Sequence, residues 1–170
     1  FAGYGIETLY KPFRKNYSMG FEIFHVKQRS FDQRFSFKDY STVTGHINFG
    51  YSLPLGIESN LSYGRYLAKD DGFTFDLGRR TRSGFKAGIY FTRTNVSAET
   101  FGEGSFDKGF YFFIPIQYFF SNYSKPLTGF GLRPIQRDGA QSLIHSRHLY
   151  GVTDQASEYN IFRTWDTFYD

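Results

Sequence analysis

A strict alternation of apolar and polar side chains constrains this chain more than any other feature. From residue 42 to residue 51, one set of positions holds Val43, Gly45, Ile47, Phe49 and Tyr51, and the interleaved set holds Thr42, Thr44, His46, Asn48 and Gly50. The same period of two recurs over residues 73–78 and 85–92. Successive side chains of a β-strand point to opposite faces, so these segments are predicted to be strands with one dry face.

Weaker alternation marks further strands, and the composition agrees with them. We expect these at residues 4–11, 19–26, 57–66, 109–120 and 127–136, with a short one at 149–152, which makes about nine strands in all. The chain holds 22 Phe, 14 Tyr and 18 Gly, and its mean hydropathy is −0.45. Aromatic residues favour strands and Gly favours turns, so an all-β fold is predicted.

The connections between these strands are predicted to alternate in length. Short turns are expected at residues 12–16, 52–56, 81–84 and 121–126, and longer connections at 28–39, 67–72, 95–108 and 137–148. Outer-membrane barrels have short periplasmic turns and long outer loops. No apolar run approaches the roughly 20 residues of a membrane-spanning helix. We therefore predict a segment of an antiparallel transmembrane β-barrel.

This prediction divides the chain into two parts. Residues 1–153 are expected to form the C-terminal portion of a barrel, and residues 154–170 a periplasmic tail with a short amphipathic helix at 158–170. An odd number of strands cannot close an ordinary bacterial barrel, so an upstream part of the same barrel is an expected partner. The residues expected to face lipid are Val43, Ile47, Phe75, Leu77, Phe85 and Ile89.

Tyrosines at predicted strand ends suit the interfacial girdles of such a barrel, where a ring meets lipid and a hydroxyl meets water. They are Tyr10, Tyr17, Tyr51, Tyr63, Tyr66 and Tyr118.

Composition argues against several classes of function. The chain has no Cys, which excludes disulfides, zinc–thiolate sites and a Cys nucleophile. The formal net charge is +4, but the basic residues are scattered singly, so no nucleic-acid partner is expected.

No catalytic site is expected, and the chain is predicted not to be an enzyme. His145 and His148, or Glu103 and Asp107, could bind a metal from a loop, but solvated loop residues are the favoured interpretation, and neither a metal nor a cofactor is predicted.

A glycosidase needs two carboxylates roughly 5 to 10 Å apart, for which Glu58, Asp76 and Glu103 are the candidates. We expect Glu58 and Asp76 instead to pair with Arg80 or Lys86 inside the barrel.

Four stretches of the sequence resemble a known family. They are Gly5–Pro12, Phe31–Tyr40, Val96–Phe110 and Arg133–Ala140, and the match to the long segment 96–110 is fairly specific. Through them the chain resembles the C-terminal region of the YjbH/GfcD family of exopolysaccharide- and capsule-associated outer-membrane lipoproteins. Ala140 stands where the family pattern leads us to expect Gly.

The resemblance implies a barrel in the Gram-negative outer membrane that works with polysaccharide assembly or export proteins. Our first hypothesis is a barrel that lines or supports a path for the polysaccharide, with outer-membrane lipid, the polymer and periplasmic or outer-membrane export proteins as partners. Residues expected to contact polymer are Arg80, Lys86, Tyr90, Glu103, Asp107 and Lys108. The alternatives are a plugged structural barrel that anchors periplasmic partners, or a soluble ligand-binding barrel, which would need its dry strand faces turned inward.

Overall fold

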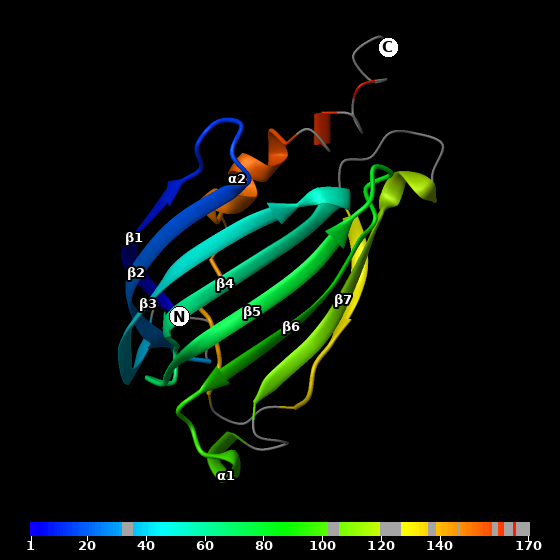
Figure 1. Ribbon diagram of the computed structural model, residues 1–170. Helices are drawn as coiled ribbons and strands as arrows, with labels where there is room; N and C mark the ends of the chain where they lie inside the picture. Colours follow the sequence, from blue (N-terminus) through cyan, green and yellow to red (C-terminus); the bar gives the residue numbers. More distant parts are fainter. Residues whose placement is uncertain are drawn as a thin grey trace.

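Eight antiparallel strands form a single curved sheet in the computed structural model, which describes residues 1–31, 36–101, 106–119, 127–135, 139–145, 147–157, 160–161 and 165 (Figure 1). The strands are β1 (Ala2–Tyr10), β2 (Tyr17–Arg29), β3 (Phe37–Leu53), β4 (Ile57–Arg65), β5 (Asp71–Arg80), β6 (Lys86–Thr94), β7 (Asp107–Pro115) and β8 (Leu127–Leu132). The helical segments are η1 (Pro54–Gly56), α1 (Ala98–Phe101), η2 (Ile116–Tyr118) and α2 (Leu149–Gln155).

Each strand pairs with its neighbours along the chain, from β1 at one edge of the sheet to β8 at the other. The all-β prediction is confirmed, and the prediction of about nine strands is corrected to eight. Residues 149–152, expected to be a strand, lie in helix α2. Within the described residues β1 pairs with β2 and β8 with β7, so the sheet has two edges and is not a closed barrel.

Several predicted boundaries also move. The strand expected at residues 109–120 is β7, which ends at Pro115, where the 3-10 turn η2 begins. The connection expected at residues 95–108 contains helix α1. Its last two residues, Asp107 and Lys108, belong to strand β7. Residues 66–70, between β4 and β5, form a link as short as the turn at 81–85. The predicted alternation of short and long connections is therefore only partly observed.

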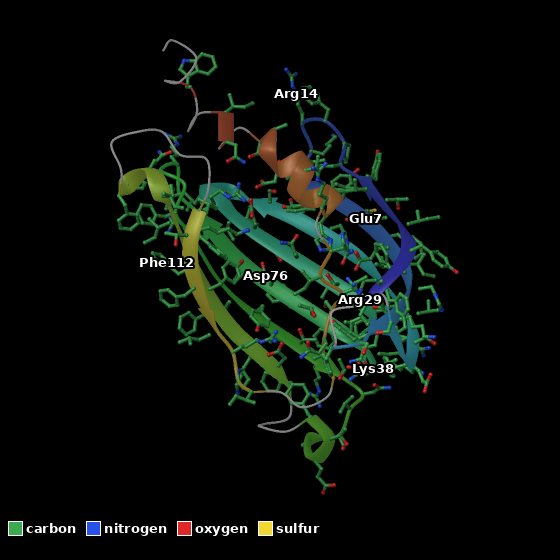
Figure 2. All side chains as sticks on the ribbon, turned by 180° about the vertical axis from the view of Figure 1, so that it is seen from behind. Glu7, Arg14, Arg29, Lys38, Asp76 and Phe112 are labelled. Atoms are coloured by element: carbon green, nitrogen blue, oxygen red, sulfur yellow. The ribbon has the colours of Figure 1, made fainter. Side chains whose placement is uncertain are left out.

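The two faces of the sheet differ in chemistry, because residues directly opposed on neighbouring strands project to the same side. One row contains Glu22, His46 and Gly64, while the next positions along the strands form the row Phe21, Ile47 and Tyr63. We call the first side the polar face and the second the apolar face. Figure 2 shows Asp76 on the polar face and Phe112 pointing away from it.

The residues predicted to face lipid belong to the apolar side. Ile47 is 63% exposed and Ile89 is 59% exposed. Phe75 and Leu77 are half-buried among neighbouring side chains, and the Phe75 ring lies 5.6 Å from that of Phe91. Phe85 precedes β6, and its ring contacts those of Phe112 and Tyr118. Val43 is 46% exposed on the same face. That these side chains meet lipid stays a prediction.

Buried side chains gather on the polar face and many are hydrophilic. Thr44 and His46 are 1% and 4% exposed, and Thr44 donates a hydrogen bond to the Arg65 carbonyl at 2.6 Å. Tyr66, predicted to be an interfacial girdle residue, is completely buried. Its ring packs edge-on against His46, and its hydroxyl shares a hydrogen bond of 2.6 Å with the Thr74 hydroxyl. The girdle prediction is therefore wrong for Tyr66.

The chain after β8 returns across the polar face. We call residues 139–145 and 147–155 the crossing segment. It begins beside the β4–β5 link, where the Ala140 N–H donates to the Asp70 carboxylate at 2.7 Å and the Leu67 N–H to the Gln141 carbonyl at 2.9 Å. It ends in α2, which lies over the opposite ends of β1 to β3 (Figures 1 and 2). The crossing segment therefore lies over part of the polar face, on the side of β1 to β4 (Figure 2).

Helix α2 runs across the boundary expected at residues 153 and 154. Most of the helix expected at residues 158–170 lies outside the described residues. Among the helices that are described, none has the length and apolar character needed to span a bilayer.

Candidate functional site

A row of titratable side chains crosses the first three strands on the polar face. Glu7 of β1 opposes Glu22 of β2, and Glu22 opposes His46 of β3. His46 Nδ1 lies 3.0 Å from Glu22 Oε1, and the His46 side chain is 4% exposed. The strand pairing thus places two carboxylates side by side, although like charges directly opposite each other destabilise a sheet.

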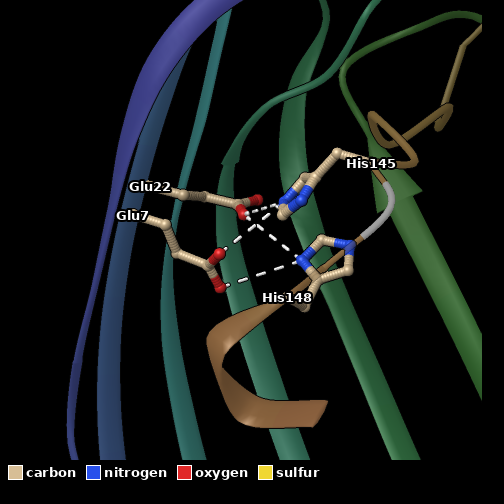
Figure 3. Close-up of side chains that lie close together, drawn as sticks. All are labelled: Glu7, Glu22, His145 and His148. Atoms are coloured by element: carbon tan, nitrogen blue, oxygen red, sulfur yellow. Dashed lines mark ion pairs between the residues drawn. The ribbon is translucent and has the colours of Figure 1, made fainter. Parts of the chain in front are cut away.

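Two histidines of the crossing segment face these carboxylates (Figure 3). His145 Nε2 lies 3.8 Å from Glu7 Oε2 and 3.8 Å from Glu22 Oε2. His148 Nδ1 lies 3.8 Å from Glu7 Oε1 and 3.9 Å from Glu22 Oε2. The four residues each offer one ligand atom, and these atoms all lie within 4.8 Å of one another. The expectation of a solvated loop residue is therefore wrong for His145, which is half-buried, whereas His148 is exposed as expected.

A second charged cluster joins β4, β5 and β6 to helix α2. Glu58 Oε2 lies 3.3 Å from Lys86 Nζ, and Glu58 Oε1 lies 3.7 Å from the Arg80 guanidinium. Arg80 also meets both carboxylate oxygens of Asp154, at 2.9 and 3.0 Å. The predicted pairing of Glu58 with Arg80 and Lys86 is confirmed. The two-pronged contact with Asp154 holds α2 to the sheet through a planar, bidentate geometry.

Asp76 is held mainly by a tyrosine. The Tyr111 hydroxyl donates to Asp76 Oδ1 at 3.0 Å. The Tyr111 ring lies over Gly78 and Gly88, which oppose each other on β5 and β6 and where an added Cβ would collide with it. These two glycines therefore provide the space for the ring. The carboxylate at position 76 thus has a structural hydrogen-bond partner that the sequence did not indicate.

Tyr150 of α2 lies over the polar face near the ends of β1 and β3. A Cβ added to Gly50 would touch its ring, and Lys11 Nζ lies 5.1 Å from the ring centroid. Burial, reinforced by the negative charges of Glu58 and Asp154, raises the pKa of Tyr150 to about 12. Its hydroxyl therefore stays neutral at physiological pH.

Between the sheet and the crossing segment lies a cavity of about 460 Å³. Its sheet wall includes Asn48, Asn60 and Ser62, and its other wall includes Ile144 and Tyr150. Amide and hydroxyl groups beside an aromatic ring are the groups that hydrogen-bond and stack with neutral polar ligands.

The residues predicted to contact polymer do not all share this face. Arg80, Lys86 and Tyr90 do, since Arg80 opposes Lys86 and Asp76 opposes Tyr90. Asp107 opposes Thr92 on the polar face and is 3% exposed, so it is an interior group and not a loop residue. Lys108 opposes Phe91 and projects from the apolar face. Glu103 lies outside the described residues.

Sequence reasoning missed several members of these clusters. They are Glu7, Glu22, His46, Tyr111 and Asp154. For the first pair a partial signal existed, because the hairpin of the predicted strands 4–11 and 19–26 places residues 7 and 22 near each other, although the predicted bounds do not fix the register that the structure shows. No spacing in the sequence indicates that the crossing segment brings His145, His148 and Asp154 to the same face.

The fold and the site together define an all-β protein whose curved sheet carries an exposed apolar face and a polar face partly covered by its own chain. The chain belongs to the YjbH family, described as "Exopolysaccharide biosynthesis protein YbjH", whose model matches residues 1–155. It is 39% identical over 163 residues to a protein of Escherichia coli (strain K12) described as "Uncharacterized lipoprotein YjbH". The match covers 92% of this chain and 23% of that relative. No solved structure matches the chain significantly.

Proposed function

We propose that this chain is part of an outer-membrane β-barrel that lines or supports a path for exopolysaccharide, without enzymatic activity. The observation that carries the proposal is the distribution of side chains on the sheet. Large hydrophobic residues are exposed on one face, while Thr44, His46, Thr92 and Asp107 are buried on the other. A water-soluble domain has the reverse distribution, whereas a membrane barrel places apolar residues outward and polar residues inward.

The direction in which the apolar side chains point also bears on the alternative of a soluble ligand-binding barrel. That alternative requires Phe75 and Ile89 to point toward the enclosed side. Ile89 instead opposes Leu77 and Phe110 on the exposed apolar face, away from the crossing segment. The arrangement therefore favours the membrane proposal over a barrel of lipocalin type.

The family description is the reason for proposing exopolysaccharide as the polymer, and the cavity is lined by polar groups that can bind sugars. Asn48, Asn60 and Ser62 offer donors and acceptors for sugar hydroxyls, and Tyr150 offers a ring face. Arg80 and Lys86 are paired with Glu58 and Asp154, so their charges are largely compensated within the protein. We therefore place the primary polymer contacts at the neutral polar groups, with the charged cluster holding their geometry. The rest of the same barrel and polysaccharide-export proteins are the proposed partners.

Substitutions at two adjacent positions of β4 test the proposed polymer path. Ser62 lines the cavity, whereas Leu61 projects from the apolar face. Ser62→Trp should lower the amount of surface polysaccharide by filling the cavity, while Leu61→Trp should leave it unchanged. Both variants are compared at equal outer-membrane abundance of the protein, together with Arg80→Ala/Lys86→Ala, which tests the charged cluster. Normal polysaccharide in the Ser62→Trp and double variants would contradict a polymer path on this face. It would favour a plugged structural barrel that anchors export proteins, for which the crossing segment is the supporting feature.

A further inference from the structure

The cluster of Glu7, Glu22, His145 and His148 has the donor set of a transition-metal site. Carboxylate oxygens and imidazole nitrogens are both common zinc ligands. In a tetrahedral site with ligands about 2.0–2.1 Å from zinc, the ligand atoms lie about 3.3 Å from one another. The distances from His145 Nε2 to the two carboxylates are 3.8 Å. Those two distances are too long for hydrogen bonds, and a contraction of about half an ångström would bring each of the two to the tetrahedral spacing.

The charges of the cluster also call for a cation. Glu7 and Glu22 are directly opposed on neighbouring strands, and their side chains are 17% and 13% exposed. The rings of His145 and His148 are centred 3.6 Å apart, so two imidazolium ions there would repel each other strongly. One divalent cation would neutralise both carboxylates and leave both histidines in the neutral form that binds metal.

Surrounding groups already orient the two carboxylates. Glu22 Oε1 is hydrogen-bonded to His46 Nδ1 at 3.0 Å, and Glu7 Oε1 accepts a hydrogen bond from the Leu149 N–H at 3.0 Å. The second oxygen of each carboxylate is the one that faces His145. His145 Nε2 is buried and has no hydrogen-bond partner among the described residues. Such outer hydrogen bonds typically fix the ligands of protein metal sites.

We propose that Glu7, Glu22, His145 and His148 form a zinc site that fastens the crossing segment to strands β1 and β2. The ligands come from two parts of the chain far apart in sequence, so metal binding adds a link between the crossing segment and the sheet to those made by the Leu149 N–H with Glu7 and by Arg80 with Asp154. Mixed oxygen and nitrogen ligands favour zinc over Mg²⁺ and Ca²⁺, which prefer oxygen ligands alone.

The first experiment measures zinc binding to the protein expressed at its full encoded length and purified in detergent. Titration with ZnCl₂ after chelation should show one site, and His145→Ala or His148→Ala should weaken binding at least tenfold. His25→Ala is the matched control, because His25 lies on β2 but projects from the apolar face beside Tyr4. Unchanged zinc affinity in both cluster variants would refute the proposal, as would the absence of binding to the wild type.

A second experiment needs no substitution. Arg147 lies between the two histidines and is exposed, and Arg82 is exposed in the turn between β5 and β6. Zinc should slow tryptic cleavage after Arg147 relative to EDTA-treated protein and leave cleavage after Arg82 unchanged. X-ray absorption at the zinc edge of the wild-type protein should show two imidazole ligands. Equal cleavage rates after Arg147 with and without zinc, or a spectrum without imidazole, would overturn the proposed link.

Discussion

At the scale of single residues, backbone conformation explains why Gly suits position 140. Ala140 stands where Gly was expected, and its φ angle is +54°. It follows Gly139, whose φ is +108°, and its N–H donates to Asp70 at 2.7 Å. An L-residue in the left-handed region costs roughly 1–2 kcal/mol, whereas Gly adopts it freely. The start of the crossing segment is therefore strained by one side chain.

Ala140→Gly should stabilise the protein by up to roughly 1 kcal/mol, because relief of the strain exceeds the added flexibility of the unfolded chain. The midpoint of denaturant unfolding measures the effect. Ala87→Gly is the control, since Ala87 lies in regular strand β6 and gains nothing from Gly. A lower midpoint for Ala140→Gly, as expected for Ala87→Gly, would show that position 140 is not strained.

At the scale of the elements, periodicity found the strands because successive side chains alternate between the polar and the apolar face of the sheet. It failed at residues 149–152, where a short run such as Leu149-Tyr-Gly-Val suits either a strand or a helix. Contacts distant in sequence decide the outcome there, since Tyr150 packs near Gly50 and Asp154 pairs with Arg80. Local pattern also placed Asp107 in a loop, although it belongs to β7.

The two charged clusters of the candidate site likewise differ in how far the sequence predicts them. Glu58, Arg80 and Lys86 lie on consecutive strands at positions that the alternation assigns to one face, so their pairing was predictable. The proposed zinc ligands combine a β-hairpin with the crossing segment, which lies far away in the sequence, and no local rule connects them. The predicted hairpin brings Glu7 and Glu22 to neighbouring strands, but only the observed register places them directly opposite each other.

The apolar face makes a prediction at this scale. Phe75→Arg should reduce insertion into lipid, because a charge at mid-bilayer on the outer side of a barrel costs roughly 2–4 kcal/mol. Ser62→Arg is the matched control, since Ser62 lines the cavity on the polar side of the neighbouring strand. Folding efficiency of the full encoded protein into liposomes is the measurement. Insertion of Phe75→Arg at wild-type efficiency would count against lipid contact at this face.

At the scale of the whole molecule, the two edges of the sheet bear on whether the proposed barrel includes a further part. In the described residues the outer edges of β1 and β8 have no strand partner. Inside lipid each unpaired backbone group costs several kcal/mol, so a spanning sheet must close. The matched region is 23% of the length of the Escherichia coli relative, which leaves room for additional strands in a protein of that length.

Residues 1–170 expressed alone should therefore aggregate when transferred to detergent or liposomes, whereas the protein at its full encoded length should remain monodisperse. Exposed edges of β1 and β8, together with an apolar face that includes Ile47 and Ile89, would join one copy to the next. Size-exclusion chromatography and a comparison of gel mobility with and without heating measure the outcome for both proteins. Eight strands are enough to close a small barrel if β1 pairs with β8. A monodisperse, heat-modifiable species from residues 1–170 alone would establish that closure and remove the need for additional strands.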